Sequence, residues 1–567
     1  MRYSVLSLLI LVLAASSTAA EADRGVTQRL VPAPAGGPKF QSSTPPKDCP
    51  FPRSKLFTGV VFTGRYKNYT TADTWYPSWA SDGHLYSPWT DGRVGKVGSS
   101  SGPRRWTTGH AKIEGDDPLN LKVTALGLHK APATPYGGRY PCGSLVHEGV
   151  WYYGTYCLDK KKYPWDIMGP FVGFRISKDL GKTWTDTPCT PAKPLFGESG
   201  KGGAKIKMGS PHFVDFGKNM QHSPDGKAYL TGHGATRKDA TCSWVSGDQV
   251  NLARVTPTLK NINDVTKYEF FAGRDADGKA IWTKEFARIK PLLEWNDRMG
   301  CVTATYNPAL KKYLMCVTDG GASGMGTYDT MILEADRITG PWKLAAFMPK
   351  FGQQAYFVNI PSKFINRDGR MMWLCFSDDW VRKHPSSPPA TRYAMCLYEM
   401  KLLRPSDKLP APTVDPLKSP SNIAPKAKAT ASSSHPGYSP AGGIDGVVGG
   451  YPGNIKQEWA SNKESKGAWL RLEWKSPQMI DRVWLFDRPN KYDYITTGEL
   501  TFSDGATVKV GSLPDDASSG REVAFPARKV SWVQFKVTGV KTGYGHIGLA
   551  EFAVFAAKSP KIVKPAK

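Results

Sequence analysis

The stretch Ser177-Lys178-Asp179-Leu180-Gly181-Lys182-Thr183-Trp184 places an acid, a glycine and a tryptophan at fixed spacing after the apolar run FVGFRI. Asp and Gly are turn formers, because the Asp side chain bonds to the nearby backbone and Gly accepts a positive φ. Tryptophan brings a large apolar surface that needs a packing partner. The stretch therefore predicts a tight turn after a buried strand, with a tryptophan packed beside it.

A second pattern, a turn followed by a short aromatic strand, recurs on both sides of this stretch. The five copies are DGHLYSPWTDG from Asp82, HEGVWYYGTY from His147, SPDGKAYLTGHG from Ser223, NPALKKYLMCVTDG from Asn307 and NRDGRMMWLCFSDD from Asn366. Spacings of roughly 60–85 residues suit four-stranded blades with loops. We expect an all-β protein whose residues 55–403 form a five-bladed β-propeller that is the catalytic domain, and the abundance of Gly, Pro, Trp and Tyr agrees.

The opening stretch resembles the Asp-box of sialidases and related propellers, in which the motif supports the turn between blade strands and does not mark the catalytic face. Residues 334–342 (EADRITGPW) end in a GPW that is similar to the five-bladed arabinanase and xylosidase families. Both stretches follow a run that ends a third strand. The resemblance implies a propeller that acts on carbohydrate.

Residues 423–557 resemble discoidin modules, also called factor 5/8 type C, which include family 32 carbohydrate-binding domains. The segments that carry the likeness are residues 429–434 (ATASSS), 444–446 (IDG), 458–460 (EWA), 469–474 (WLRLEW), 480–483 (IDRV) and 548–554 (GLAEFAV). The resemblance implies a galactose-binding-like β-sandwich jelly roll that binds sugar. It also implies a structural Ca²⁺ held by Asp445 and Glu551; no cofactor is expected for catalysis.

The remaining segments predict an exported protein. Residues 1–22 have the layout of a cleavable signal, with an early charge, a short apolar run and small residues, so we expect a secreted protein, extracellular or periplasmic. No apolar run is long enough to span a membrane. Residues 23–54, the Pro-rich linker 404–422 and the tail 558–567 are expected to be unstructured.

Charge and cysteine content leave the partner open. The net charge of +26 suits an anionic partner, but the lysines are spread out and no RNA-binding signature occurs, so nucleic acid is not expected. All nine cysteines precede the linker and form no metal motif; one or two structural disulfides are compatible with them. We expect a monomer.

Glycosidic bonds are cleaved by two carboxyl groups, so the search is for acids that face one cleft. Asp73 leads a run containing Trp75, Tyr76 and Trp79, which could line a sugar subsite. It resembles the general-base Asp of the first blade in glycoside hydrolase family 43, although Thr74 stands where that family has proline. The alternative is a strand-leading cap.

The other catalytic candidates precede or end blade strands. Asp91 would lie across the first hairpin from Asp73, with an ordinary Asp-Gly turn as the alternative. His212 and Asp248 come from the third copy, as does the substrate-binding candidate Asp215.

Asp297, a catalytic candidate, and Arg298, a substrate-binding candidate, precede the fourth copy and could instead pair with each other on a surface loop. Tyr356 and Asn359 are candidate sugar contacts in the fifth blade. No Glu in the third copy matches the family 43 general acid.

In the second domain the candidate sugar contacts are Trp459, Asp487 and Arg488; Trp459 is more often core in this fold. Together these features predict a secreted glycoside hydrolase acting on a polysaccharide through paired carboxylates. The alternatives are a non-catalytic lectin that uses the same cleft, and a polysaccharide lyase acting on an acidic glycan.

Overall fold

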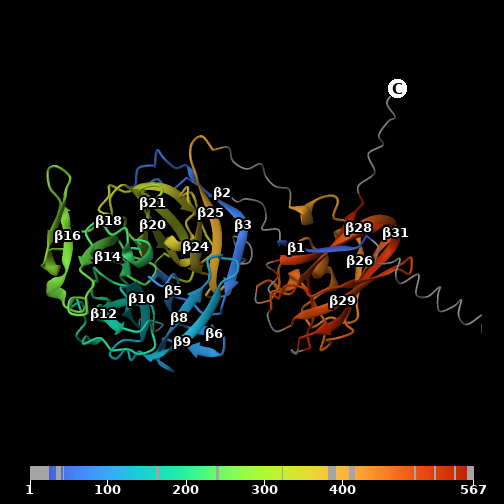
Figure 1. Ribbon diagram of the computed structural model, residues 1–567, viewed down its shortest axis with the longest axis horizontal. Helices are drawn as coiled ribbons and strands as arrows, with labels where there is room; N and C mark the ends of the chain where they lie inside the picture. Colours follow the sequence, from blue (N-terminus) through green and yellow to red (C-terminus); the bar gives the residue numbers. More distant parts are fainter. Residues whose placement is uncertain are drawn as a thin grey trace, which may run out of the picture. The chain divides into compact units, whose positions relative to one another are not determined.

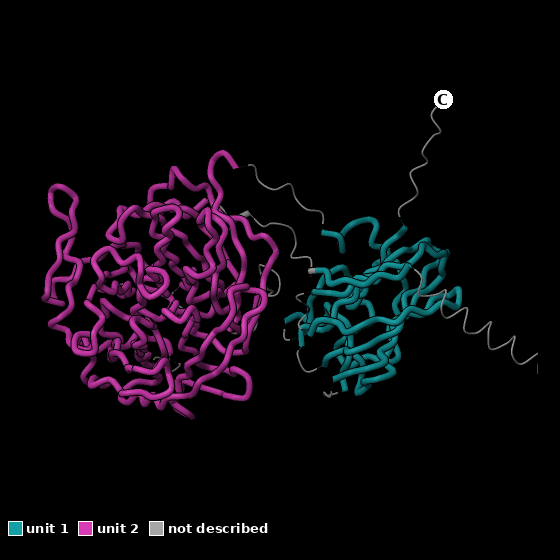
Figure 2. The backbone as a smooth tube through the Cα atoms, viewed as in Figure 1, with its two compact units in different colours: residues 1–37, 412–567 teal, residues 38–411 magenta. Residues whose placement is uncertain are grey.

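The computed structural model describes residues 25–32, 40–41, 44–160, 162, 165–237, 242–321, 324–380, 391–407, 415–451, 453–490, 493–515, 517, 519–541 and 545–557. The chain forms two compact units (Figure 2), Pro38–Ala411 and a second unit that combines Met1–Gly37 with Pro412–Lys567. The described residues form strands and short 3-10 helices, with no α-helix among them. The 3-10 helices are Lys201–Gly203, Lys218–Met220, Val265–Lys267, Phe286–Arg288, Ser362–Phe364, Pro416–Lys418, Ala424–Lys426, Pro440–Ile444 and Ile455–Gln457.

The first unit is a five-bladed β-propeller (Figure 1). From the innermost strand outwards, the first blade contains β4 (Ser78–Trp79), β5 (Leu85–Trp89), β8 (Thr107–Glu114) and β9 (Lys122–Lys130). The second blade contains β10 (Gly138–His147), β11 (Val150–Asp159) and β12 (Ile167–Ser177). The third blade contains β13 (His212–Phe213), β14 (Ala228–Gly234), β15 (Gln249–Val255), β16 (Glu269–Arg274) and β17 (Ala280–Thr283). β18 (Leu293–Glu294) also pairs with β15, and β6 (Gly92–Val94) forms a hairpin with β7 (Val97–Ser99).

The last two blades complete the ring. The fourth contains β19 (Gly300–Asn307), β20 (Lys312–Asp319), β21 (Asp329–Ala335) and β22 (Lys343–Met348), and the fifth contains β23 (Tyr356–Asn359), β24 (Met371–Ser377) and β25 (Met395–Leu403). The fourth strand of the fifth blade is β3 (Gly59–Tyr69), from the start of the unit, with β2 (Phe40–Gln41) at its edge. Leu403 pairs with Gly59 and Met395 with Tyr69, so the two ends of the propeller sequence share one sheet.

The five copies of the sequence pattern occupy equivalent places, each containing the second strand of its blade: β5, β11, β14, β20 and β24. These strands are buried along almost their whole length. A strand covered on both faces reads as a continuous apolar and aromatic run, which is why the pattern stands out. The expected propeller is confirmed.

The Asp-box forms the turn after β12. Asp179 accepts hydrogen bonds from the Ser177 hydroxyl at 2.7 Å and from the backbone N–H of Thr183 at 2.8 Å. Trp184 packs between blades, its ring centroid 5.1 Å from that of His110 on β8 and 4.7 Å from that of His129 on β9. The GPW stretch joins β21 to β22 in the fourth blade.

The second unit is a β-sandwich built on an eight-stranded arrangement, as expected for a jelly roll. Its strands are β1 (Thr27–Pro32), β26 (Lys428–Ala431), β27 (Trp459–Ala460), β28 (Trp469–Asp487), β29 (Ile495–Phe502), β30 (Thr507–Val510), β31 (Ser519–Val540) and β32 (Gly548–Ala556). The long strands β28 and β31 alternate buried and exposed residues, and their inward side chains form one apolar core.

Two segments expected to be unstructured are partly ordered. Within 23–54, β1 pairs with β31 of the second unit, and the backbones of Pro52 and Ser54 bond to Leu344 on β22. Within 404–422, Leu417 is buried in the second unit and Asn422 pairs with Phe555, so that unit starts before residue 423. Short segments with mostly exposed side chains lack the periodicity that reveals a strand.

Three further expectations concern the two ends of the chain, the cysteines and membrane-spanning segments. The signal at 1–22 and the tail 558–567 lie outside the described residues. All nine cysteines are described and none forms a disulfide. Among the described residues, no helix is both long and apolar enough to cross a bilayer.

Candidate functional site

Asp73 and Asp91 line one cavity of about 390 Å³ in the propeller. The other residues that line it are Thr74, Ser100, Gly102, Pro103, Tyr140, Tyr156, Leu158, Trp165, Trp244, Tyr356, Phe357, Trp380 and Tyr393. They come from the first, second, third and fifth blades. The cavity therefore depends on the closed ring and belongs to no single blade.

A backbone bridge brings the two acids together. Asp73 and Thr90 exchange two backbone hydrogen bonds of 3.0 Å, so Asp91, the next residue, lies beside Asp73 across the first hairpin, as its sequence position predicts. Asp91 then leads into β6, with a φ of +44°. Its carboxylate accepts the backbone N–H of Ser101 at 2.7 Å, which makes the turn more than an ordinary Asp-Gly hairpin tip.

Backbone strain accompanies the pair. Thr74 has a φ of +64°, which is rare for a β-branched residue and unfavourable by about 1–3 kcal/mol. Proline is fixed near −65° and cannot adopt this conformation. The backbone conformation at position 74 is therefore one that proline could not take. Non-glycine residues with positive φ concentrate where a structure fixes a functional geometry.

Hydroxyl groups surround Asp73. The Thr74 hydroxyl donates to Asp73 Oδ1 at 2.8 Å and the Tyr356 hydroxyl donates to Oδ2 at 3.0 Å. The Tyr393 hydroxyl donates to the backbone carbonyl of Asp91 at 2.6 Å. Tyr356 and Tyr393 therefore fix the positions of both acids from the last blade.

Burial raises the pKa of both acids, and the charge of Asp91 adds to the shift of Asp73. Burial, reinforced by the charge of Asp91, raises the pKa of Asp73 to about 8. Burial raises the pKa of Asp91 to about 6, against the effect of its bond from Ser101. Two carboxyl groups close together in a shielded site cannot both ionise easily, so the pair retains one proton near neutral pH. One group is thus able to donate a proton while the other is anionic.

Several lining residues gave little signal in the sequence. Tyr140, Trp165, Trp244, Trp380 and Tyr393 surround the acids with aromatic rings, the kind of surface that packs against sugar. Trp380 follows β24 and Tyr393 precedes β25, which are buried strands of the fifth blade. An aromatic residue just outside a strand end is therefore the sequence signal that identifies such lining residues.

Five predicted residues lie in a different place, a narrower cavity of about 50 Å³ bordered by the innermost strands of all five blades. They are Tyr76, Trp79, His212, Asp215 and Asn359. Neither Asp73 nor Asp91 borders this cavity. Their predicted roles beside the acid pair do not fit this placement.

Three of these five have structural bonding partners. Asp215 accepts from the backbone N–H and the hydroxyl of Ser362, both at 2.7 Å. Asn359 donates to the Trp75 carbonyl at 2.9 Å. His212 is buried against Tyr76 with ring centroids 4.0 Å apart, and burial lowers its pKa to about 3, which leaves it neutral.

The remaining propeller candidates lie outside the acid cavity. Trp75 is 1% exposed and stacks on Trp89 in the core. Asp248 accepts the backbone N–H of Thr236 and Arg237, which caps a loop. Arg298 pairs with Asp319; its Nη1 lies 2.6 Å from Asp319 Oδ2. Asp297 does not line the acid cavity.

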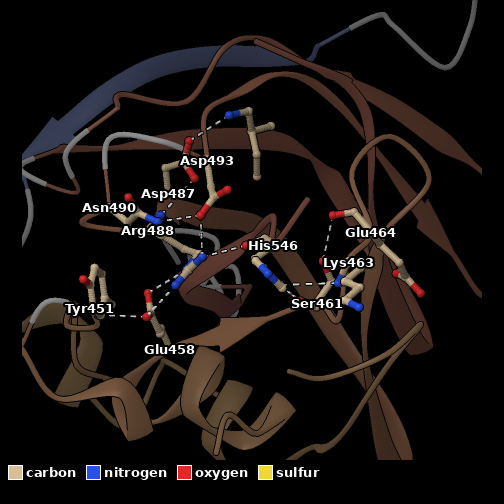
Figure 3. Close-up of polar contacts among 11 residues, drawn as sticks. Tyr451, Glu458, Ser461, Lys463, Glu464, Asp487, Arg488, Asn490, Asp493 and His546 are labelled. Carbon is tan, nitrogen blue, oxygen red and sulfur yellow. Dashed lines mark hydrogen bonds and ion pairs between the residues drawn. The ribbon is translucent and has the colours of Figure 1, made fainter. Parts of the chain in front are cut away.

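In the second unit Arg488 lies at the centre of a buried polar cluster (Figure 3). It makes a bidentate pair with Glu458 at 3.0 Å, a bond to Asp493 at 2.8 Å and a bond to the His546 carbonyl at 2.6 Å. With these partners and 3% exposure, Arg488 connects loops rather than presenting its guanidinium to a ligand.

The other two predicted sugar contacts of this unit are also internal. Asp487 is fully buried and accepts the backbone N–H groups of Arg488 and Ile495. Trp459 is fully buried in the core and donates to the Ser433 carbonyl at 2.8 Å. Neither side chain has surface left for a sugar, which corrects the prediction.

The predicted calcium residues lie close to each other. Glu551 is fully buried, its Oε2 accepts the Gly446 N–H at 3.0 Å, and its Oε1 has no bonding partner among the described residues. Burial, with the charge of Asp445, raises the pKa of Glu551 well above its usual range. An unpaired buried carboxylate oxygen beside a second carboxylate fits a hard cation such as Ca²⁺. The Lys418 ammonium, 3.2 Å from the Asp445 carbonyl, is the positive group already nearby.

One family model and several solved structures are similar to part of the chain. Residues 422–555 match the model of a domain of unknown function (DUF7402). No curated protein sequence matches the chain. Two solved structures that resemble this part are chitosan-binding module 1 from a chitosanase/glucanase of Paenibacillus sp. IK-5 and CpGH89CBM32-5 from Clostridium perfringens. Both are 24% identical to this chain, cover 24% of it and have a TM-score of 0.20. The match spans 98% of the first structure and 100% of the second.

A third solved structure is the family 32 carbohydrate-binding module of NanJ from C. perfringens, in complex with galactose. It is 17% identical, covers 24% of this chain and 98% of its own, and has a TM-score of 0.20.

We predict that Asp73→Asn stabilises the propeller. Because the folded-state pKa is raised, the wild-type side chain costs stability progressively as pH increases from about 4 towards 8, and Asn carries no such cost. The midpoint of thermal unfolding should rise by roughly 2–4 °C at pH 8 and by less at pH 5. Asp215→Asn, which loses well-made bonds, should lower it. A fall for Asp73→Asn at pH 8 would refute the idea.

We also predict that Ca²⁺ raises, and a chelator lowers, the unfolding midpoint of the second unit. A bound ion stabilises the folded state in proportion to the logarithm of its concentration over its Kd. Calorimetry of the full chain measures both transitions, and the propeller transition serves as the internal control. Glu551→Gln should abolish the response; an unchanged midpoint in the wild-type protein rules the site out.

Proposed function

We propose that the propeller is a glycoside hydrolase and that the second unit binds its carbohydrate. The observation that carries this proposal is the pair Asp73 and Asp91, two partly buried carboxyl groups that line one aromatic cavity and whose pKa values are both raised. Glycosidic cleavage needs one carboxyl group as acid and one as base or nucleophile. Export through the signal at 1–22, to the extracellular space or the periplasm, belongs to the same proposal.

The residues act in a simple order. The protonated carboxyl group of the pair gives its proton to the leaving glycosidic oxygen as the bond to the anomeric carbon breaks. The ionised carboxylate either attacks that carbon or removes a proton from the attacking water. Tyr356 and Tyr393 hold the acids in place, and the surrounding rings pack against the sugar and exclude water.

The charge of the cavity indicates the substrate class. The described lining residues present two carboxyl groups and tyrosine hydroxyls, and none of them is Arg, Lys or His. A uronate or sulfate group would meet the ionised member of the pair and be repelled. The cavity therefore favours a neutral sugar, and the acid pair favours hydrolysis over a lyase, for which a basic pocket was the expected sign.

The experiment is release of new reducing ends from a panel of neutral, uronic and sulfated polysaccharides. We expect activity on a neutral polymer, with kcat/KM rising as pH passes about 6, where the base ionises, and falling above about 8, where the acid loses its proton. Asp73→Asn and Asp91→Asn should each reduce the rate by about 10²–10⁴-fold. Asp248→Asn is the matched control, a buried Asp outside the cavity.

Rescue experiments separate the two roles. The variant that lacks the acid should retain activity on a substrate with a good leaving group, and the variant that lacks the base or nucleophile should be rescued by azide. A folded wild-type protein that releases no reducing ends would leave the lectin alternative. A product with double-bond absorbance would instead identify a lyase.

For the second unit we propose a sugar site beside the Arg488 cluster. Tyr451 is 47% exposed, and its backbone N–H donates to Glu458 at 2.8 Å, so the buried cluster fixes this loop. Tyr438, half-buried, lies under the Arg488 guanidinium, and His435 and His546 are 4.6 Å apart between ring centroids. Exposed aromatic rings on rigid loops are suited to stacking against sugar rings.

Tyr451→Ala should weaken binding of the full chain to its polysaccharide about fivefold to tenfold, because one stacking surface is lost. Affinity electrophoresis measures the change. The rate on a short soluble substrate should not change, because the cavity lies in the propeller. Leu259→Ala, an exposed apolar residue of the propeller, is the control; equal binding by both variants would move the site elsewhere.

A further inference from the structure

The second unit contains a strand that precedes the whole propeller in the chain. β1 pairs antiparallel with β31 over six residues, from Thr27 opposite Ala524 to Pro32 opposite Ser519. Residues 521–524 of β31 pair with β28 on their other side. Without β1 this part of β31 would therefore be a sheet edge with unpaired backbone groups, a surface that accepts another strand.

Side chains fix β1 in this register. Arg29 Nε lies 2.6 Å from Glu522 Oε1. The Gln28 amide donates to the Lys509 carbonyl at 2.8 Å and accepts the Gly511 N–H at 3.1 Å. These contacts reach both β31 and the end of β30, and a slip of one residue would break them and turn Val31 outwards.

Val31 anchors the strand in an apolar cluster. It is 5% exposed and shares the cluster with Leu417, Phe486 and Phe555, among others. Its neighbour Leu30 points away and is 58% exposed. Thr27, Gln28 and Arg29 are exposed as well, so Val31 is the apolar anchor of β1 and its other contacts are backbone and polar side-chain bonds.

We infer that β1 is a clasp, a second connection between the propeller and the sandwich that does not depend on the Pro-rich linker. The chain runs from β1 into the propeller and returns through residues 404–414, so a cut in that linker leaves β1 attached to the propeller by covalent bonds and to β31 by hydrogen bonds. A protein exposed to proteases would thereby keep its two units together. This inference is independent of the proposed function.

The test is to place a site-specific protease sequence within residues 408–414 of the full chain, cleave it, and measure association of the two fragments by sedimentation. We expect the fragments to associate, and Val31→Asp to weaken the association at least about tenfold, because a charge replaces a buried apolar side chain. Leu30→Asp, one residue away on the exposed face, should associate like the parent.

Two further readouts keep the inference falsifiable if a variant folds poorly. Arg29→Glu should weaken the association, and adding Glu522→Arg should restore it, which a general folding defect would not do. In the uncut wild-type chain, amide exchange should be slow for the β1 amides that bond to β31. Fragments that separate at all concentrations, equal effects of the Leu30 and Val31 variants, or unprotected amides in β1 would each overturn the clasp.

Discussion

The pairing of β3 with β25 is the constraint on which the acid site depends. It joins the first part of the propeller sequence to the last, so the first and fifth blades become neighbours. The hydrogen bond from Tyr356 to Asp73 crosses this junction and links residues far apart in the sequence. Without the closed ring, Asp73 would lose Tyr356 and Tyr393, and the cavity would have no walls on that side.

The closed propeller also offsets the energetic cost of an unfavourable local structure. Two carboxyl groups that resist joint ionisation and a threonine at positive φ lower stability at a single turn. Five fully covered second strands, one in each blade, provide a core large enough to offset this cost. Thr74 and Asp91, both at positive φ, line the cavity.

The sequence predicted what depends on local patterns and missed what depends on the direction of side chains. The repeats and the Asp-box identified the propeller because buried second strands and tight turns have distinctive residues. The position of Asp91 could be predicted because the first hairpin places it beside Asp73. The predicted role of Trp75 was wrong because its side chain packs on Trp89 in the core, and that of Asp248 was wrong because its carboxylate caps a loop. β1 was missed because a mostly exposed edge strand resembles a linker.

In both units, the bonding partners of a carboxylate distinguish acids that stabilise the fold from acids that are available for proton transfer. Asp215, Asp248 and Asp487 accept backbone N–H groups, and Glu458 and Asp493 share the Arg488 guanidinium. Such acids are fully used by the fold and cannot release or gain a proton without loss of stability. Asp73 and Asp91 have no cation among the described cavity residues, and burial raises the pKa of both. A carboxyl group that keeps its proton near neutral pH can give that proton to a substrate and regain it, which is the property that a general acid requires.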